Sequence, residues 1–95
     1  MTKQGVSGPV GVTYTYNDFN EACSNARNAA KQGQLGDVDR HLGTVLESSK
    51  QLRLGGVDDI CQQLMILAIS THIQTGKIDM ELIRRYGSKY NLLRD

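Results

Sequence analysis

The stretch VDDICQQLMILAISTHIQT, residues 57–75, contains the longest run of apolar residues in the chain, from Leu64 to Ile69. Its apolar residues recur at the three- and four-residue spacing of a helix, and its polar residues are confined to a narrow strip. Such a helix is predicted to lie at the centre of the fold, surrounded on most sides. Its broad inner face is predicted to contain Val57, Ile60, Cys61, Leu64, Met65, Leu67 and Ala68.

Two helices are predicted before this stretch. The first covers residues 18–31, and Asp18 with Glu21 three residues later resembles a capping box. The second covers residues 37–53, with Asp37 as its N-cap and Gly55-Gly56 as its stop.

One more helix is predicted after it, beginning at Asp79. Gly87 is expected to interrupt this helix, with residues 88–93 forming one further turn. Acidic residues stand in the first turn of each predicted helix and basic residues stand at its end, which is the arrangement that helix dipoles favour.

The predicted fold class is all-α. Residues 17–95 are expected to form a compact four-helix bundle, and residues 1–16 an N-terminal tail. Residues 10–16, VGVTYTY, alternate and are rich in β-formers. The tail is therefore expected to be either flexible or a strand that pairs with another molecule.

Length and composition limit the function classes. The chain has 95 residues, a net charge of +1 and 39% hydrophobic residues, which fits one domain without a strong field toward nucleic acid or acidic membranes. The N-terminus carries no signal-peptide pattern, and the longest apolar run is too short to span a bilayer. We therefore expect a cytoplasmic protein that does not bind membranes.

Catalysis is not expected, and no cofactor or metal is implied. The chain contains none of the phosphate-loop, dinucleotide, nucleophile-elbow or zinc-helix motifs. Cys23 and Cys61 fall on apolar stripes, where reduced, buried thiols are expected to be inert. His72 is expected at a core edge and His41 beside the apolar stripe of residues 37–53, and a catalytic role for either is the less favoured alternative.

Ile66, Ile69 and Ile73 form the first candidate site. They lie on a flank of the helix over residues 57–75, outside its main apolar face. Either the last helix covers this flank, or a partner does. We expect a non-enzymatic protein-interaction module, an adaptor or regulator, that binds a protein partner or a second copy through this flank.

The basic C-terminal segment is the second candidate site. Arg84, Arg85, Lys89 and Arg94 cluster near two tyrosines, and a turn at Gly87 followed by Ser88 loosely imitates a helix-turn-helix. Nucleic-acid binding through these residues is therefore the alternative function. Against it, the helix after the turn would have only about two turns before the chain ends.

Overall fold

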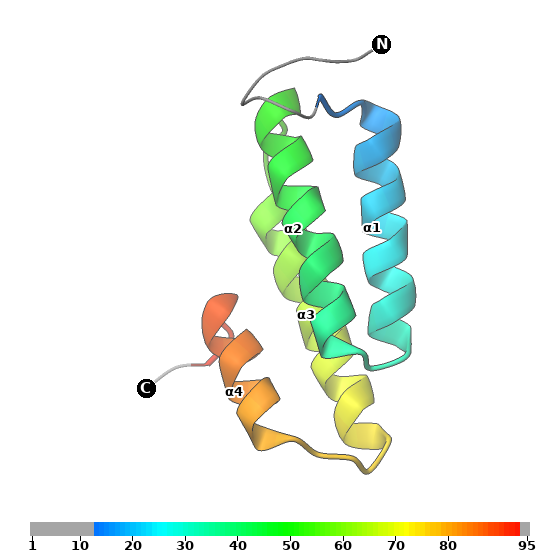
Figure 1. Cartoon of the computed structure of the whole chain (residues 1–95). Helices are drawn as coiled ribbons and strands as arrows, with labels where there is room; N and C mark the ends of the chain where they lie inside the picture. Colours follow the sequence, from blue (N-terminus) through cyan, green and yellow to red (C-terminus); the bar gives the residue numbers. More distant parts are fainter. Residues whose placement is uncertain (1–12, 94–95) are drawn as a thin grey trace.

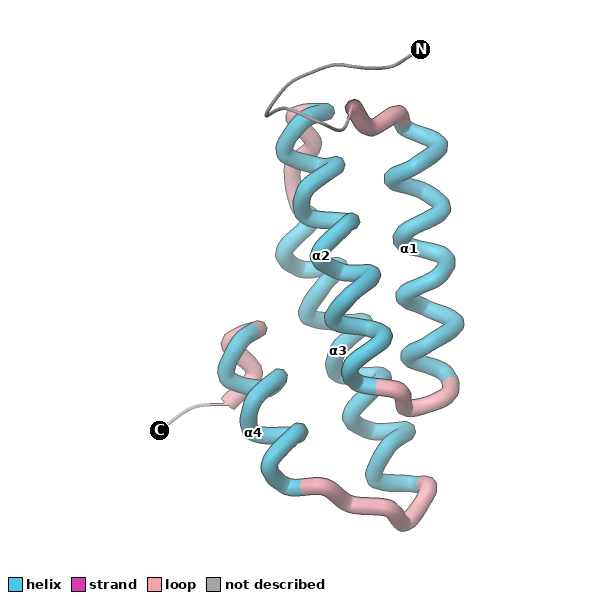
Figure 2. The backbone as a smooth tube through the Cα atoms, in the orientation of Figure 1, coloured by secondary structure: helices cyan, strands magenta, loops and turns pink. Residues whose placement is uncertain are grey.

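The computed structural model of the 95-residue chain describes residues 13–93. It contains four helices: α1 (Tyr16–Lys31), α2 (Leu35–Leu52), α3 (Val57–Gln74) and α4 (Met80–Lys89), drawn in Figure 1. Within residues 13–93 no strand is present, as Figure 2 shows. The all-α prediction is confirmed. The predicted tail falls mostly outside the described residues, except that Tyr16 already belongs to α1.

The first three helices run up and down beside one another, and the shorter α4 turns back against them (Figure 1). Each of α1, α2 and α3 contacts the other two, while α4 contacts α2 and α3 but not α1. The predicted central position of residues 57–75 is wrong in part. Helix α3 does contact the other three helices, but Ile60, Ile66, Leu67 and Ile73 are exposed, so it is not surrounded on most sides.

The core is mostly aliphatic, in keeping with a chain in which only 5% of residues are aromatic, and Tyr90 is the one aromatic among the buried core residues of the described chain. The inner face of α1 is lined with alanines, which allow it to approach α2 closely. Larger side chains of α2 and α3 fill the space between the helices, and Leu42 and Met65 are the largest that are fully buried. The other buried apolar residues of the three long helices are Ala22, Ala26, Ala29, Ala30, Leu35, Val38, Val45, Val57, Cys61, Leu64 and Ala68.

Two helix starts differ from their predictions. Thr15, not Asp18, caps α1: Thr15 Oγ1 accepts from the Asp18 backbone N–H at 3.1 Å, and Asp18 Oδ2 accepts from the Thr15 N–H at 2.9 Å. This reciprocal pair satisfies two backbone donors, which makes it the better capping box. For α2 the cap position is Gln34, and Asp37 lies in the first turn, paired with Arg40 at 3.4 Å. The predicted cap at Asp79 is confirmed.

The ends of α2 and α4 also differ from their predictions. Helix α2 ends before the Gly55-Gly56 pair, because Arg53 adopts the left-handed conformation (φ 58°) and the Leu54 N–H bonds back to the Ser49 carbonyl. Helix α4 continues through Gly87 to Lys89. Gly87 is buried, and a Cβ there would lie 2.7 Å from Leu93 Cγ, so the missing side chain makes room for the returning chain.

Gly33 joins α1 to α2 at a point where the turn touches the backbone of α3. It has φ +70°, and a Cβ on it would lie 2.9 Å from the His72 backbone nitrogen and 3.2 Å from the Thr71 carbonyl carbon. Backbone atoms cannot rotate away as a flexible side chain can. Glycine at this position therefore determines how closely the turn packs on α3.

Replacing Gly33 with alanine should destabilise the fold. The steric overlap with α3 and the left-handed backbone together should cost about 2–4 kcal/mol of unfolding free energy, measured by urea denaturation. Gly43→Ala is the matched control, because nothing lies within 4 Å of a Cβ there. That change should stabilise α2 by about 0.5–1 kcal/mol. Equal effects of the two substitutions would contradict the close approach at Gly33.

Candidate protein-binding face

The outer surface of α3 carries almost no charge. Residues 60–76 contain no Asp, Glu, Lys or Arg, although these four types make up 22% of the chain. A helix surface that only faces water normally carries several such residues. This stretch therefore has the composition of a surface that contacts another apolar surface.

Large aliphatic side chains are exposed along both edges of this surface, the edge toward α1 and the edge toward α4. Eight large apolar residues are exposed among residues 13–93, and four of them belong to α3. They form two rows at seven-residue spacing. Ile60 and Leu67, 37% and 38% exposed, form the α1-side row, whereas Ile66 and Ile73, 49% and 45% exposed, form the α4-side row.

The α1-side row borders a groove between α1 and α3. This groove has a volume of about 460 Å³, and Phe19 and Cys23 of α1 line it opposite Ile60 and Leu67. The prediction that Ile60 and Leu67 belong to the inner face is wrong, because the alanine-rich α1 does not reach over them. Their seven-residue spacing on one flank was the available signal for a second exposed row.

The α4-side row contains two members of the predicted flank. Ile66 and Ile73 are exposed, whereas Ile69 is half-buried and packs against the core. Gln62 lies on the same side of α3 by helical spacing, and its Nε2 donates to the Tyr90 carbonyl at 2.9 Å. Helix α4 thus covers the flank only in part. Ile69 is covered within the chain, and the expectation that a partner covers Ile66 and Ile73 stays a prediction.

Polar contacts hold the end of α4 against α2 and α3. Tyr90 Oη donates to Asp39 Oδ1 at 2.7 Å, and Lys89 Nζ lies 2.7 Å from the same oxygen. Burial raises the pKa of the Tyr90 phenol well above its ordinary value, and the hydrogen bond to the Asp39 carboxylate and its charge raise it further. At the start of α4, the Asp79 backbone N–H donates to His72 Nε2 at 3.1 Å.

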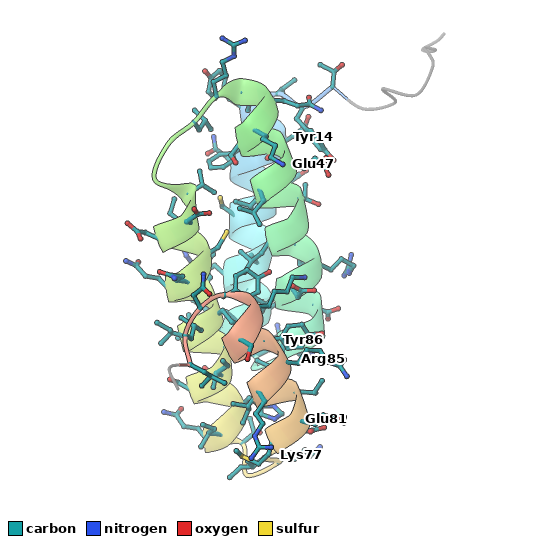
Figure 3. The ribbon with its side chains drawn as sticks, turned by 90° about the vertical axis from the view of Figure 1, so that its left-hand side faces the viewer. Tyr14, Glu47, Lys77, Glu81, Arg85 and Tyr86 are labelled. Carbon is teal, nitrogen blue, oxygen red and sulfur yellow. The ribbon has the colours of Figure 1, made fainter. Side chains whose placement is uncertain are left out.

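The basic candidate residues do not form the predicted helix-turn-helix. Because α4 is continuous through Gly87, no second helix begins at Ser88. Arg84 and Arg85 are exposed on α4, and Lys89 is paired with Asp39. Arg94 lies outside the described residues. Figure 3 shows Glu81 one turn before Arg85 on the same side of α4, where its carboxylate offsets part of the basic charge.

The predicted chemical residues are dispersed. His41 is half-buried beside a shallow hollow of about 260 Å³, which Asp18 and Glu21 also line, between α1 and α2. Cys61 is buried and Cys23 half-buried, and both are free thiols. Burial raises the pKa of both, that of Cys61 to about 11. Among residues 13–93 no group of three or more His, Cys, Asp or Glu is placed to hold a metal ion.

The chain matches no protein-family model, no curated protein and no solved structure. Within the part of the chain that the structure describes, no helix combines the length and apolar character needed to cross a membrane.

Tyr90→Phe should weaken the docking of α4. Losing the hydrogen bond to a charged acceptor should lower the unfolding free energy by about 1–2 kcal/mol, measured by thermal and urea denaturation near neutral pH. Tyr16→Phe is the matched control, since Tyr16 is 61% exposed. It should leave stability unchanged.

The same substitution should change the alkaline stability profile. The unfolded phenol deprotonates near its ordinary pKa of about 10, whereas the raised pKa keeps the folded phenol protonated. The folded state then binds more protons, so this contribution is complete below pH ~10 and falls as the pH rises further. In Tyr90→Phe the stability should fall less steeply with pH in that range. An identical slope would show that Tyr90 does not contribute.

The two thiols should differ in reactivity. Cys61 is 2% exposed and Cys23 is half-buried, so alkylation of the native chain near neutral pH should be about tenfold slower at Cys61 than at Cys23. Mass spectrometry of the alkylated peptides measures both sites at once. In urea the two rates should converge, and a native Cys61 that reacts as fast as in urea would contradict its burial.

Proposed function

We propose that this protein is a small non-enzymatic interaction module, an adaptor or regulator, that binds protein through the exposed face of α3. The observation that carries this proposal is the pairing of two exposed aliphatic rows with a 17-residue stretch, residues 60–76, free of Asp, Glu, Lys and Arg. Exposed apolar side chains that are grouped on one face, rather than scattered singly, are typical of binding sites on soluble proteins.

Burial of the two rows supplies a driving force for association. Fully burying an isoleucine or leucine side chain is worth about 1.5–3 kcal/mol, and each of the four is between one third and one half exposed. A partner covering all four would therefore gain on the order of 3–5 kcal/mol from these side chains alone. The uncharged polar residues between the rows can hydrogen-bond without a large desolvation cost.

The properties of the thiols support binding rather than nucleophilic chemistry. A thiolate is the reactive form of cysteine, and the raised pKa of Cys61 disfavours it. The two free cysteines also fit a reducing compartment, so we propose a cytoplasmic location.

Nucleic-acid binding through α4 is the weaker proposal. It now rests on the two exposed arginines Arg84 and Arg85, because Lys89 is neutralised by Asp39 and Glu81 stands one turn before Arg85. The electrostatic affinity for nucleic acid grows with the number of phosphates that free lysines and arginines neutralise. Two arginines on different sides of one short helix provide few such contacts.

Site-specific photo-cross-linking tests the proposed function. A photoreactive phenylalanine analogue is placed at Ile66 or Ile73 of the full chain, and irradiation of cells producing it should give discrete protein adducts. The same analogue at Lys50, an exposed position on α2, is the matched control and should give none. Ile73→Lys should remove the adducts formed from position 66, with unchanged helix content by circular dichroism.

The absence of adducts at both α3 positions would overturn the proposal. So would adducts that form equally well at Lys50, because they would show non-specific capture. Ile69→Lys is not a suitable probe of binding, since Ile69 packs against the core and its replacement should unfold part of the bundle.

A further inference from the structure

We propose that the partner on this face is a second copy of the chain, packed α3 against α3 in antiparallel orientation. This inference rests on the proposed function and specifies its partner. In Figure 3, α3 runs along the left-hand edge of the molecule, and the segment after α4 overlaps part of it in this view. Ile60, Ile66, Leu67 and Ile73 are exposed along the helix.

The lack of charge on α3 favours a second copy as occupant. In a two-fold dimer each surface meets its own equivalent, so any charge near the axis faces the same charge. Residues 60–76 carry no Asp, Glu, Lys or Arg that would repel in this way. Gln63 and Ser70, the polar residues on this surface, are uncharged and add no such repulsion.

Charges at the two ends of the face determine the orientation. Asp58 and Asp59 are exposed at the start of α3, and Lys77 is exposed just beyond its end. Antiparallel packing brings the acidic end of one copy to the basic end of the other. Parallel packing would instead place acid against acid and base against base, while also aligning the two helix dipoles.

The spacing of the exposed residues gives a register. Asp59, Gln63, Ile66, Ser70 and Ile73 follow one another at intervals of four and three, which is the seam spacing of paired helices. Aligning Asp59 with Lys77 of the second copy then determines which residues of the two helices lie opposite each other along the contact.

In this register the large side chains meet small or flexible ones. Gln63 lies opposite Ile73 of the second copy, and Ile66 lies opposite Ser70, whose short side chain allows close approach. On the α1 side, Leu67 lies beside Leu67 of the second copy. The two-fold axis then passes at the level of residue 68.

Charge reversal with light scattering tests both the partner and the orientation. The purified full chain should have twice its 10.5 kDa mass. Asp59→Lys and Lys77→Glu should each raise the dimer dissociation constant by about tenfold. Mixing the two single variants should restore tight pairing, because each reversed end then meets an opposite charge. The double variant should also form a dimer.

Asp58→Lys is the matched control. It makes the same change of charge in the same helical turn, but about 100° around the helix from Asp59 and away from the seam. Its dimer should dissociate as the wild type does. In a parallel dimer position 59 would meet position 59 and position 77 would meet position 77, so each single variant would only replace one pair of like charges by another. Single variants that dissociate as the wild type does would therefore overturn the proposed orientation.

Cysteine cross-linking tests the register independently. Leu67→Cys should form a disulfide with itself across the axis under mild oxidation, identified by mass spectrometry of the linked peptides. Ile60→Cys should not do so, although Ile60 is equally exposed. On the α1 side its neighbour in the second copy is Gln74, not Ile60. A mixture of Ile60→Cys and Gln74→Cys chains should cross-link.

Failure of this inference differs from failure of the proposed function. A purified chain that is monomeric, together with adducts of another protein at positions 66 and 73, would overturn the second copy as partner and leave the binding face in place. A monomer without adducts would overturn both. A dimer that survives Ile73→Lys and does not respond to Asp59→Lys would use another face, and it too would overturn the inference.

Discussion

Small side chains on the inner face of α1 determine how this bundle is built. Because Ala22, Ala26, Ala29 and Ala30 are short, α1 packs closely on α2, and their shared contact is the most extensive in the fold. Helix α1 also contacts α3, but beside Ile60 and Leu67 it leaves a groove that Phe19 and Cys23 line. With α1 drawn toward α2 and α4 docked on the other side, the outer surface of α3 is left without a neighbour among the described helices.

The existence and order of the helices could be predicted from periodicity and charge polarity, whereas their ends could not. At the start of α1, Thr15 and Asp18 satisfy two backbone donors together, and this local gain extends the helix beyond the predicted Asp18 cap. At Gly87 the poor helix propensity of glycine costs about 1 kcal/mol, but the helix continues because Leu93 packs where a side chain would be. The start of α1 and the continuation of α4 both depend on contacts between residues, which the helix propensity of a single residue does not describe.

The candidate face could be predicted only in part, for a related reason. Spacing along α3 identifies Ile66, Ile69 and Ile73 as one flank, but it does not say which of them a neighbour covers. The position of α4 decides that, and it depends on Tyr90 reaching Asp39, 51 residues earlier in the chain. Sequence alone places the α1-side row on the inner face, because it shows apolar residues at Ile60 and Leu67 without showing that α1 leaves them exposed.

The exposed aliphatic residues on α3 keep between about one third and one half of their surface in water after folding, and that remaining apolar area gains nothing from the fold. Isoleucine is also a poorer helix former than lysine or glutamate by a few tenths of a kcal/mol at each position. Ile66 and Ile73, each close to half exposed, thus lower both the stability of the helix and the solubility of the monomer. The half of each side chain that stays exposed contributes nothing to the stability of the isolated bundle, and the proposed partner would remove that area from water.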